Sequence, residues 1–176
     1  MKVLAIVIMC LVLIIVGVYA VKINNKASDE ETYLRIHIRA NSNDAVDQSV
    51  KYKVKESIVD FMTPRLDGVS SKSEAMRILE DNIAAMKSVA DNTLAQNGYD
   101  YASNVSLRKE EFPARTYGDL TLDSGVYDAL IIELGSGKGD NWWCVVFPPL
   151  CFVGENTKNV EYKSFFADLY NKIFGR

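Results

Sequence analysis

The sequence contains a single histidine, His37, only three cysteines and no excess of basic residues. Lysine and arginine total 20 against 23 acidic residues, which gives a formal net charge of -3. Proteins that bind nucleic acid concentrate positive charge on one face, and this balance does not support such a partner. A structural zinc site requires four nitrogen or sulfur ligands, whereas His37, Cys144 and Cys151 supply three. We therefore expect no metal, no cofactor and no nucleic-acid partner.

One long apolar run, residues 3–21, carries no charge and has a lysine on each side. A helix that crosses the hydrocarbon core of a membrane needs about 20 apolar residues, whereas the apolar part of a secretory signal usually has about 7–15. The length favours a transmembrane anchor, but Val18-Tyr19-Ala20 resembles a cleavage site. Residues 1–21 are therefore expected to be an anchor or a signal peptide, and both place the later residues outside the cytoplasm.

Residues 22–32 form a polar linker, and residues 33–176 have the length of one domain. Cys144 and Cys151 are the two cysteines of this domain, and an even number in an oxidising compartment suggests a disulfide. Pro148-Pro149 lies between them and restricts the backbone, which can hold the two ends near each other. Two buried free thiols are the alternative.

The domain begins with a period-two pattern over residues 33–40. Apolar side chains alternate with Arg35, His37 and Arg39, which predicts a strand with one buried face and one cationic face.

Two helices are predicted after this strand. Apolar residues recur every three or four positions over 46–61, and Pro64 is expected to close this helix. Ser71 and Glu74 fit a capping box at the start of a second helix, whose apolar stripe continues to Leu94. The stripe of this second helix contains methionines and is interpreted as core rather than as a binding groove.

Strand patterns fill most of the second half of the chain. They cover residues 101–107, 112–117, 126–134 and 142–147, and the third of these is apolar on both faces, as in a central strand. A helix is expected over 162–174. We therefore predict an α+β fold in which an N-terminal hydrophobic helix precedes one domain with a mainly antiparallel sheet, two central helices and a C-terminal helix.

Three alternating glycines, Gly135, Gly137 and Gly139, suggest a phosphate-binding loop. Such a loop leads into a helix, whose free amide groups face the phosphate. Here a strand-like sequence, Trp142–Phe147, follows the glycines. We therefore expect residues 135–141 to form a hairpin loop between two core strands.

A thiol enzyme is the rival class of function. Cys144 is the candidate nucleophile and His37 is the only histidine available as its base. Arg35 and Arg39 flank His37 and disfavour its protonated form. An extracytoplasmic hydrolase or cell-wall-acting enzyme that uses this pair is the alternative hypothesis.

The stretch from Trp142 to Pro149 favours the hypothesis of a rigid aromatic surface that binds a partner. Trp142 and Trp143 have the size and the N–H group of binding hot spots, and Pro148-Pro149 stiffens the backbone that follows. Core packing of either tryptophan is the alternative.

Several motifs are distinctive in combination, namely Leu34-Arg35-Ile36, Arg39-Ala40-Asn41-Ser42, Asp47-Gln48 with Lys51, Phe112-Pro113, Tyr117-Gly118, Ser124-Gly125-Val126-Tyr127 and the stretch from Leu134 to Cys151. Together they closely resemble the stage II sporulation protein R family. The resemblance covers about residues 33–154 and resumes near Phe165–Phe174. The long stretch from Asn-Trp-Trp-Cys to Pro-Pro-Leu-Cys makes it highly specific.

The resemblance implies a signalling role rather than an enzymatic one. Members of the family are made in the forespore and exported into the space between the two membranes. There they trigger a membrane-embedded aspartic protease of the mother cell, which cleaves the inactive precursor of sigma factor E. That protease is the expected partner, and residues 3–21 would contact the membrane if they are not cleaved.

Two groups of residues are expected to contact this partner, the aromatic strand with its loop and the cationic strand with its turn. Cys144 and Cys151 are the candidate disulfide that supports them. The candidate partner-binding residues are Arg35, His37, Arg39, Asn41, Ser42, Arg115, Tyr117, Asn141, Trp142, Trp143, Pro148 and Pro149.

Overall fold

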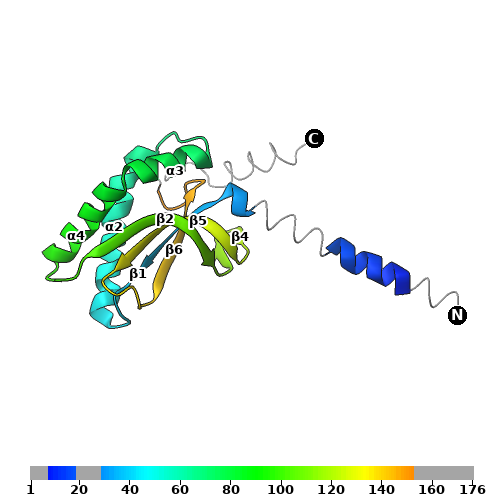
Figure 1. Ribbon diagram of the computed structural model, residues 1–176, viewed down its shortest axis with the longest axis horizontal. Helices are drawn as coiled ribbons and strands as arrows, with labels where there is room; N and C mark the ends of the chain where they lie inside the picture. The colour runs from blue at the N-terminus through cyan, green and yellow to red at the C-terminus, as the bar shows by residue number, and fades with distance from the viewer. Residues whose placement is uncertain (1–7, 19–28, 153–176) are drawn as a thin grey trace.

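The computed structural model describes residues 8–18 and 29–152. Its elements are β1 (Leu34–Arg39), α2 (Ala45–Leu66), α3 (Lys72–Asp81), α4 (Ile83–Gln96), β2 (Ser103–Phe112), β3 (Arg115–Tyr117), β4 (Leu120–Leu122), β5 (Gly125–Leu134) and β6 (Asn141–Phe147). Four strands form a sheet in the order β2-β5-β1-β6, and β3 pairs with β4 in a separate hairpin (Figure 1). The β1–β5 pair is parallel and the remaining pairs are antiparallel, so the predicted α+β class with a mainly antiparallel sheet is confirmed.

The two central strands, β1 and β5, are buried on both faces. The central position of β5 agrees with its continuous apolar run. For β1 the expectation of one exposed cationic face is wrong, because every side chain from Leu34 to Ile38 is buried. Side chains from other strands cover the polar side chains of β1. The alternation of polar and apolar residues within β1 cannot predict this cover.

Helices α2, α3 and α4 cover one face of the sheet (Figure 1). Their apolar stripes pack with the apolar side chains of the strands into one core cluster, as the 3.6-residue periodicity predicted. The fully buried members from the helices include Val54, Ile58, Met62, Leu79, Met86 and Leu94.

The second predicted helix is broken at Asn82 into α3 and α4. The Asn82 side chain donates to the Ile78 carbonyl at 2.8 Å, and its backbone N–H donates to the Leu79 carbonyl at 3.1 Å. Asparagine competes for backbone hydrogen bonds in this way and is a weak helix former, which accounts for the break. The first helix also differs from its prediction, since α2 continues past Pro64 and places Leu66 in the core.

The second face of the sheet is strongly curved. Phe112 of β2 and Trp143 of β6 belong to the two outer strands, yet their rings lie 4.9 Å apart. This contact requires β2 to curl back over β5 and β1. The β3–β4 hairpin packs on the same side through Leu122. We call the surface enclosed by the curled sheet and the hairpin the concave face. Pro113 does not lie within the predicted strand 112–117 but separates β2 from β3.

The connection between β5 and β6 is a crossover and not the predicted hairpin. β1 lies between the two strands and pairs with both, so residues 135–140 pass over the C-terminal end of β1. A glycine-rich loop can form either a hairpin or a crossover, and only the strand order shows which connection is present.

The N-terminal part of the described chain contains helical residues 8–18, whose side chains are exposed, and a helical turn at 29–32 beside β5. The Val126 N–H donates to Glu30 Oε1 at 3.2 Å and so fixes this turn. None of the helices described here has both the length and the apolar character needed to cross a membrane. The apolar run 3–21 is only partly described, and the predicted helix over 162–174 lies outside the described residues.

The capping box at the start of α3 gives a direct test of this local structure. The Glu74 N–H donates to Ser71 Oγ at 3.2 Å, and Glu74 Oε2 accepts from the Ser70 N–H at 3.1 Å. Ser71→Ala removes the capping oxygen and is expected to lower the free energy of unfolding by about 1 kcal/mol. Urea unfolding of the full chain measures this loss. The control Ser73→Ala changes an exposed serine in the same turn, and an equal loss from both variants would contradict the capping role.

Candidate functional site

The turn after β1 and the crossover loop form one hydrogen-bonded unit, which we call the joint: Asn41, Ser42, Asp47 and residues 135–140. The Gly139 N–H donates to the Ala40 carbonyl at 2.8 Å. Ser136 donates twice to Asn41, from its N–H to Oδ1 at 2.9 Å and from its hydroxyl to the carbonyl at 2.6 Å. The joint therefore brings two of the distinctive sequence motifs together, although about 95 residues separate them along the chain.

Asp47, in the first turn of α2, is the buried acceptor at the centre of the joint. The residue is 5% exposed, and its carboxylate accepts from Asn41 Nδ2 at 2.8 Å, Ser42 Oγ at 2.7 Å and Tyr101 Oη at 2.7 Å. Burial alone would raise the pKa of Asp47, but the hydrogen bonds from Ser42, Tyr101 and Asn41 outweigh it and hold the pKa below its ordinary value. Asn41 and Ser42 thus act as structural donors in the joint.

Lys51, one turn further along α2, ties the helix to the crossover loop. The residue is 1% exposed, and its ammonium group donates to Gln48 Oε1 at 2.7 Å and to the Asp140 carbonyl at 3.0 Å. Burial lowers the pKa of Lys51, and the nearby charge of Asp140 partly opposes this effect. The lysine therefore fastens the loop from the helix side.

The glycines of the loop permit close packing rather than phosphate binding. A Cβ atom on Gly139 would lie 2.2 Å from the Ser42 carbonyl oxygen, and one on Gly135 would lie 2.4 Å from Asn41 Oδ1. The amides of Ser136 and Gly139 already donate to the turn, and those of Lys138 and Asp140 donate to Asn41 and Asn43. A phosphate would have to compete with these internal acceptors.

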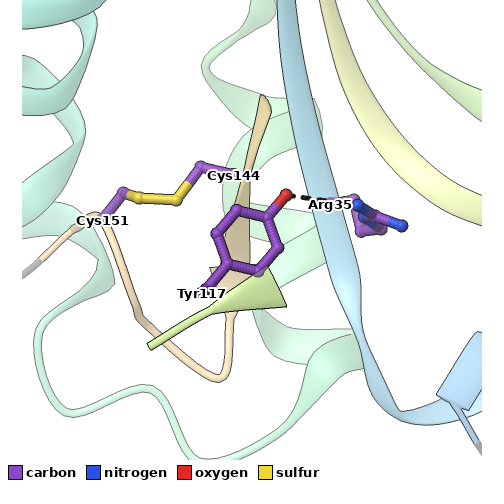
Figure 2. The surroundings of a disulfide bond; sticks show 4 residues. All are labelled: Arg35, Tyr117, Cys144 and Cys151. Carbon is purple, nitrogen blue, oxygen red and sulfur yellow. Dashed lines mark hydrogen bonds between the residues drawn. A yellow bond between two sulfur atoms is a disulfide. The ribbon is translucent and has the colours of Figure 1, made fainter. Parts of the chain in front are cut away.

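Arg35 lies on the concave face and is buried, contrary to the expectation of an exposed cationic surface. Its Nη2 donates to Tyr117 Oη at 3.2 Å, and Figure 2 shows the tyrosine hydroxyl directed at the guanidinium group. The Arg35 Cζ atom also lies 4.3 Å from the centre of the Phe112 ring and 4.8 Å from that of Tyr127. Arg35 is therefore enclosed by aromatic rings and covered by the hairpin that carries Tyr117.

His37 is the next inward-facing residue of β1 and is also fully buried, so it is not part of an exposed surface either. Its ring centre lies 5.3 Å from that of Phe112 and 4.8 Å from that of Trp143. Among the described residues, neither ring nitrogen has a hydrogen-bond partner. Burial, and next the charge of Arg39, lowers the pKa of His37 to about 4. The histidine is therefore a neutral, enclosed ring at physiological pH.

Arg39 occupies the rim of the concave face and belongs to a network of four charges. It forms ion pairs with Glu133 at 2.9 Å and with Glu110, and Arg108 pairs with the same two carboxylates at 3.5 and 2.9 Å. The Arg39 side chain is 25% exposed. The network links β1, β5 and β2 where β2 curls inward.

Cys144 and Cys151 form a disulfide that joins β6 to the turn after it (Figure 2). Cys144 belongs to the core cluster on the helix side of the sheet, opposite Ile36, whereas His37 belongs to the concave side. A Cys144–His37 catalytic pair is therefore absent from the described structure, and the thiol hydrolase lacks its base.

The two tryptophans of β6 point to opposite faces. Trp142 packs against the helix-side core, with the Lys55 ammonium 5.9 Å from its ring centre. Trp143 lies on the concave face beneath Arg115, whose Cζ atom is 5.7 Å from its ring centre. Both rings are half-buried, so each contributes to packing and also keeps accessible surface.

The remaining candidates lie around these two groups. Asn141 is half-buried opposite Arg39, Pro148 is buried, and Pro149 is half-buried in the turn that the disulfide closes. Arg115 is exposed on the hairpin. Sequence reasoning missed Tyr101, Phe112 and Tyr127 as site residues, because each meets its partner only through contacts between distant strands and helices.

The backbone of Gly139 lies so close to that of Ser42 that one added methyl group should destabilise the fold strongly. Gly139→Ala is expected to lower the free energy of unfolding by about 3 kcal/mol or more, because the new Cβ overlaps the Ser42 carbonyl oxygen. Gly118→Ala is the control: it has open space around it but a φ of +59°, and we expect a loss of about 1 kcal/mol. Urea unfolding of the full chain compares the two, and equal losses would contradict the close packing.

The burial of His37 predicts a pH dependence of stability. Its pKa is 6.5 in an unfolded chain and about 4 in the folded protein, so between these values the unfolded state binds more protons. The contribution of neutral His37 to the free energy of unfolding is fully present above pH 6.5. It decreases by about 3 kcal/mol as the pH falls to 4.

His37→Phe supplies the matched control, since it keeps a ring against Phe112 and Trp143 but does not titrate. The unfolding free energy of the wild type minus that of this variant should fall by about this amount from pH 6.5 to 4, as measured by urea unfolding. A difference that stays constant across this range would show that His37 is not enclosed as described.

Comparison with known proteins places these features in a family. The family described as Stage II sporulation protein R matches residues 30–157. A curated relative named Stage II sporulation protein R, from Bacillus subtilis (strain 168), is 35% identical over 134 residues, which cover 74% of this chain and 60% of the relative. No solved structure matches. The joint, the concave face and the disulfide all lie within the matched residues, and the chain belongs to the stage II sporulation protein R family.

Proposed function

We propose that this protein is an extracytoplasmic sporulation signal that activates a membrane-embedded aspartic protease, which then processes the precursor of sigma factor E. Membership of the stage II sporulation protein R family is the observation that carries the proposal. The chain spans 60% of the length of its relative, so the proposal concerns the part that the two share. A binding role is proposed rather than an enzymatic one, and the position of Cys144 and His37 on opposite faces of the sheet supports this choice over the thiol hydrolase.

The proposed location is the space between the forespore and mother-cell membranes. The Cys144–Cys151 disulfide supports it, because disulfides persist in oxidising compartments and are rare in the cytosol. The apolar run 3–21 supports export as well, whether it stays in the membrane or is removed.

Activation by binding requires a difference in affinity. We propose that the domain binds the outer face of the protease more tightly in its active arrangement and so shifts its population. A shift from 1% to 99% active would need about 10⁴-fold tighter binding to the active state, or about 5.5 kcal/mol. A rigid ligand suits this task because it loses little conformational entropy on binding. The joint and the disulfide supply that rigidity.

The accessible side of the hairpin and of β6 is the proposed contact surface. Arg115 is exposed above the half-buried Trp143, and aromatic and arginine side chains carry much of the energy of protein interfaces. Asn141 continues this surface along β6 and Pro149 continues it into the turn after β6, whereas Trp142 keeps its accessible surface on the helix side.

Reconstitution of the three proteins tests the proposal. When the full chain, the membrane-embedded protease and the sigma-E precursor are expressed together, immunoblotting should detect precursor cleavage that depends on this chain. Arg115→Ala is expected to reduce the cleavage rate at limiting concentration about fivefold or more, as the loss of an interface hot spot does. The control Arg77→Ala changes an arginine of α3 that is 70% exposed and should leave the rate unchanged. Cleavage that proceeds equally without the chain would refute the function.

A further inference from the structure

Arg35 is a buried cation for which the described part of the chain provides no buried counter-charge. The side chain is 0% exposed, and arginine stays positively charged in proteins. No carboxylate of the described residues forms an ion pair with it, and its Nε and Nη1 have no acceptor. The Tyr117 hydroxyl is the single hydrogen-bond acceptor that the described chain provides.

The aromatic surroundings compensate for this charge only in part. The faces of Phe112 and Tyr127 attract the guanidinium group, but ring faces do not accept hydrogen bonds as a carboxylate does. A buried charge that lacks a partner is strongly unfavourable. A carboxylate would satisfy the remaining donors of Arg35, and a single carboxylate matches a single cation.

The cover over Arg35 is attached to the main sheet by side-chain packing and by its short connections to β2 and β5, and not by strand pairing. Strands β3 and β4 pair with each other and with no other described strand. Side chains hold the hairpin in place, chiefly Tyr117, Leu120 and Leu122 in the cluster of the concave face. The hairpin can therefore move aside while every backbone hydrogen bond of the four-stranded sheet stays intact.

We propose that Arg35 is a carboxylate-binding site, which an aspartate or glutamate side chain of the partner protein occupies when the β3–β4 hairpin moves aside. The identity of the partner rests on the proposed function. Tyr117 then acts as a temporary acceptor that occupies the site in the free protein. His37 lies beside the site as a neutral ring and adds no second charge.

A binding measurement with the intact partners tests the site. The affinity of the full chain for the membrane-embedded protease is measured in vesicles, and the melting temperature of each variant is recorded in parallel. Arg35→Met is expected to weaken binding at least tenfold while its melting temperature stays equal to that of the wild type or rises, because an uncompensated buried charge has been removed. The control Arg77→Met removes an exposed arginine and should change neither quantity.

Arg35→Lys keeps the buried charge but loses the planar fork, so it provides a second variant if Arg35→Met does not fold. Each acidic residue on the outer side of the protease is changed to its amide in both backgrounds. One such change should weaken the binding of the wild type tenfold and that of Arg35→Lys clearly less, because the lysine ammonium group attracts a carboxylate but cannot bind it in the bidentate geometry. Full additivity for every acidic residue would overturn the site, whereas absence of binding by the wild type would refute the proposed function instead.

Acetate serves as a probe that does not depend on the partner. The Nε–H resonance of Arg35 in the full chain should shift with added acetate and saturate, while chloride at the same ionic strength should leave it in place. A resonance that responds equally to both ions, or to neither, overturns the carboxylate site even if the signalling role is correct.

Discussion

Both β5 and β6 pair with β1, so the chain must cross the end of β1 between them, and the remaining structure depends on this crossing. The crossover loop can pass only if it lies directly on the turn that follows β1, where Gly139 leaves no room for a side chain. Asp47 accepts hydrogen bonds from the side chains of that turn, and Lys51 of α2 donates to a carbonyl of the loop. One polar network thus fixes the position of α2 against the sheet and the register of β6.

The sheet that this crossing creates has two unlike faces. The helix side is an ordinary apolar core, into which Cys144 also points. The concave side contains Arg35, His37 and Arg39 among aromatic rings, under a hairpin and a rim of ion pairs. Burial of charged and polar groups there costs stability that an apolar side chain would not cost. A function for this face accounts for residues that packing alone does not require.

The sequence predicted most of the helices and strands, but it predicted less of the strand order and of the packing between them. Periodicity identified β1, β5, β6 and the helices, because their side chains repeat at the spacing of strands and helices. The crossover was misread as a hairpin because glycine and asparagine suit both connections, and strand order depends on distant pairing. Arg35 and His37 were expected at the surface because alternation predicts one polar face. The curl of β2 that buries them depends on a residue much later in the chain, Phe112.

The central claim is that the glycine-rich loop is a fixed structural joint that holds β1, β6 and α2 together before any partner binds, and amide hydrogen exchange tests it most directly. In the free full-length chain, the amides of Ser136, Gly139 and Asp140 should exchange as slowly as those of β1, because each donates to a carbonyl or side-chain acceptor of the turn after that strand. Exchange of these amides at the rate of an unstructured loop, with β1 still protected, would contradict the account.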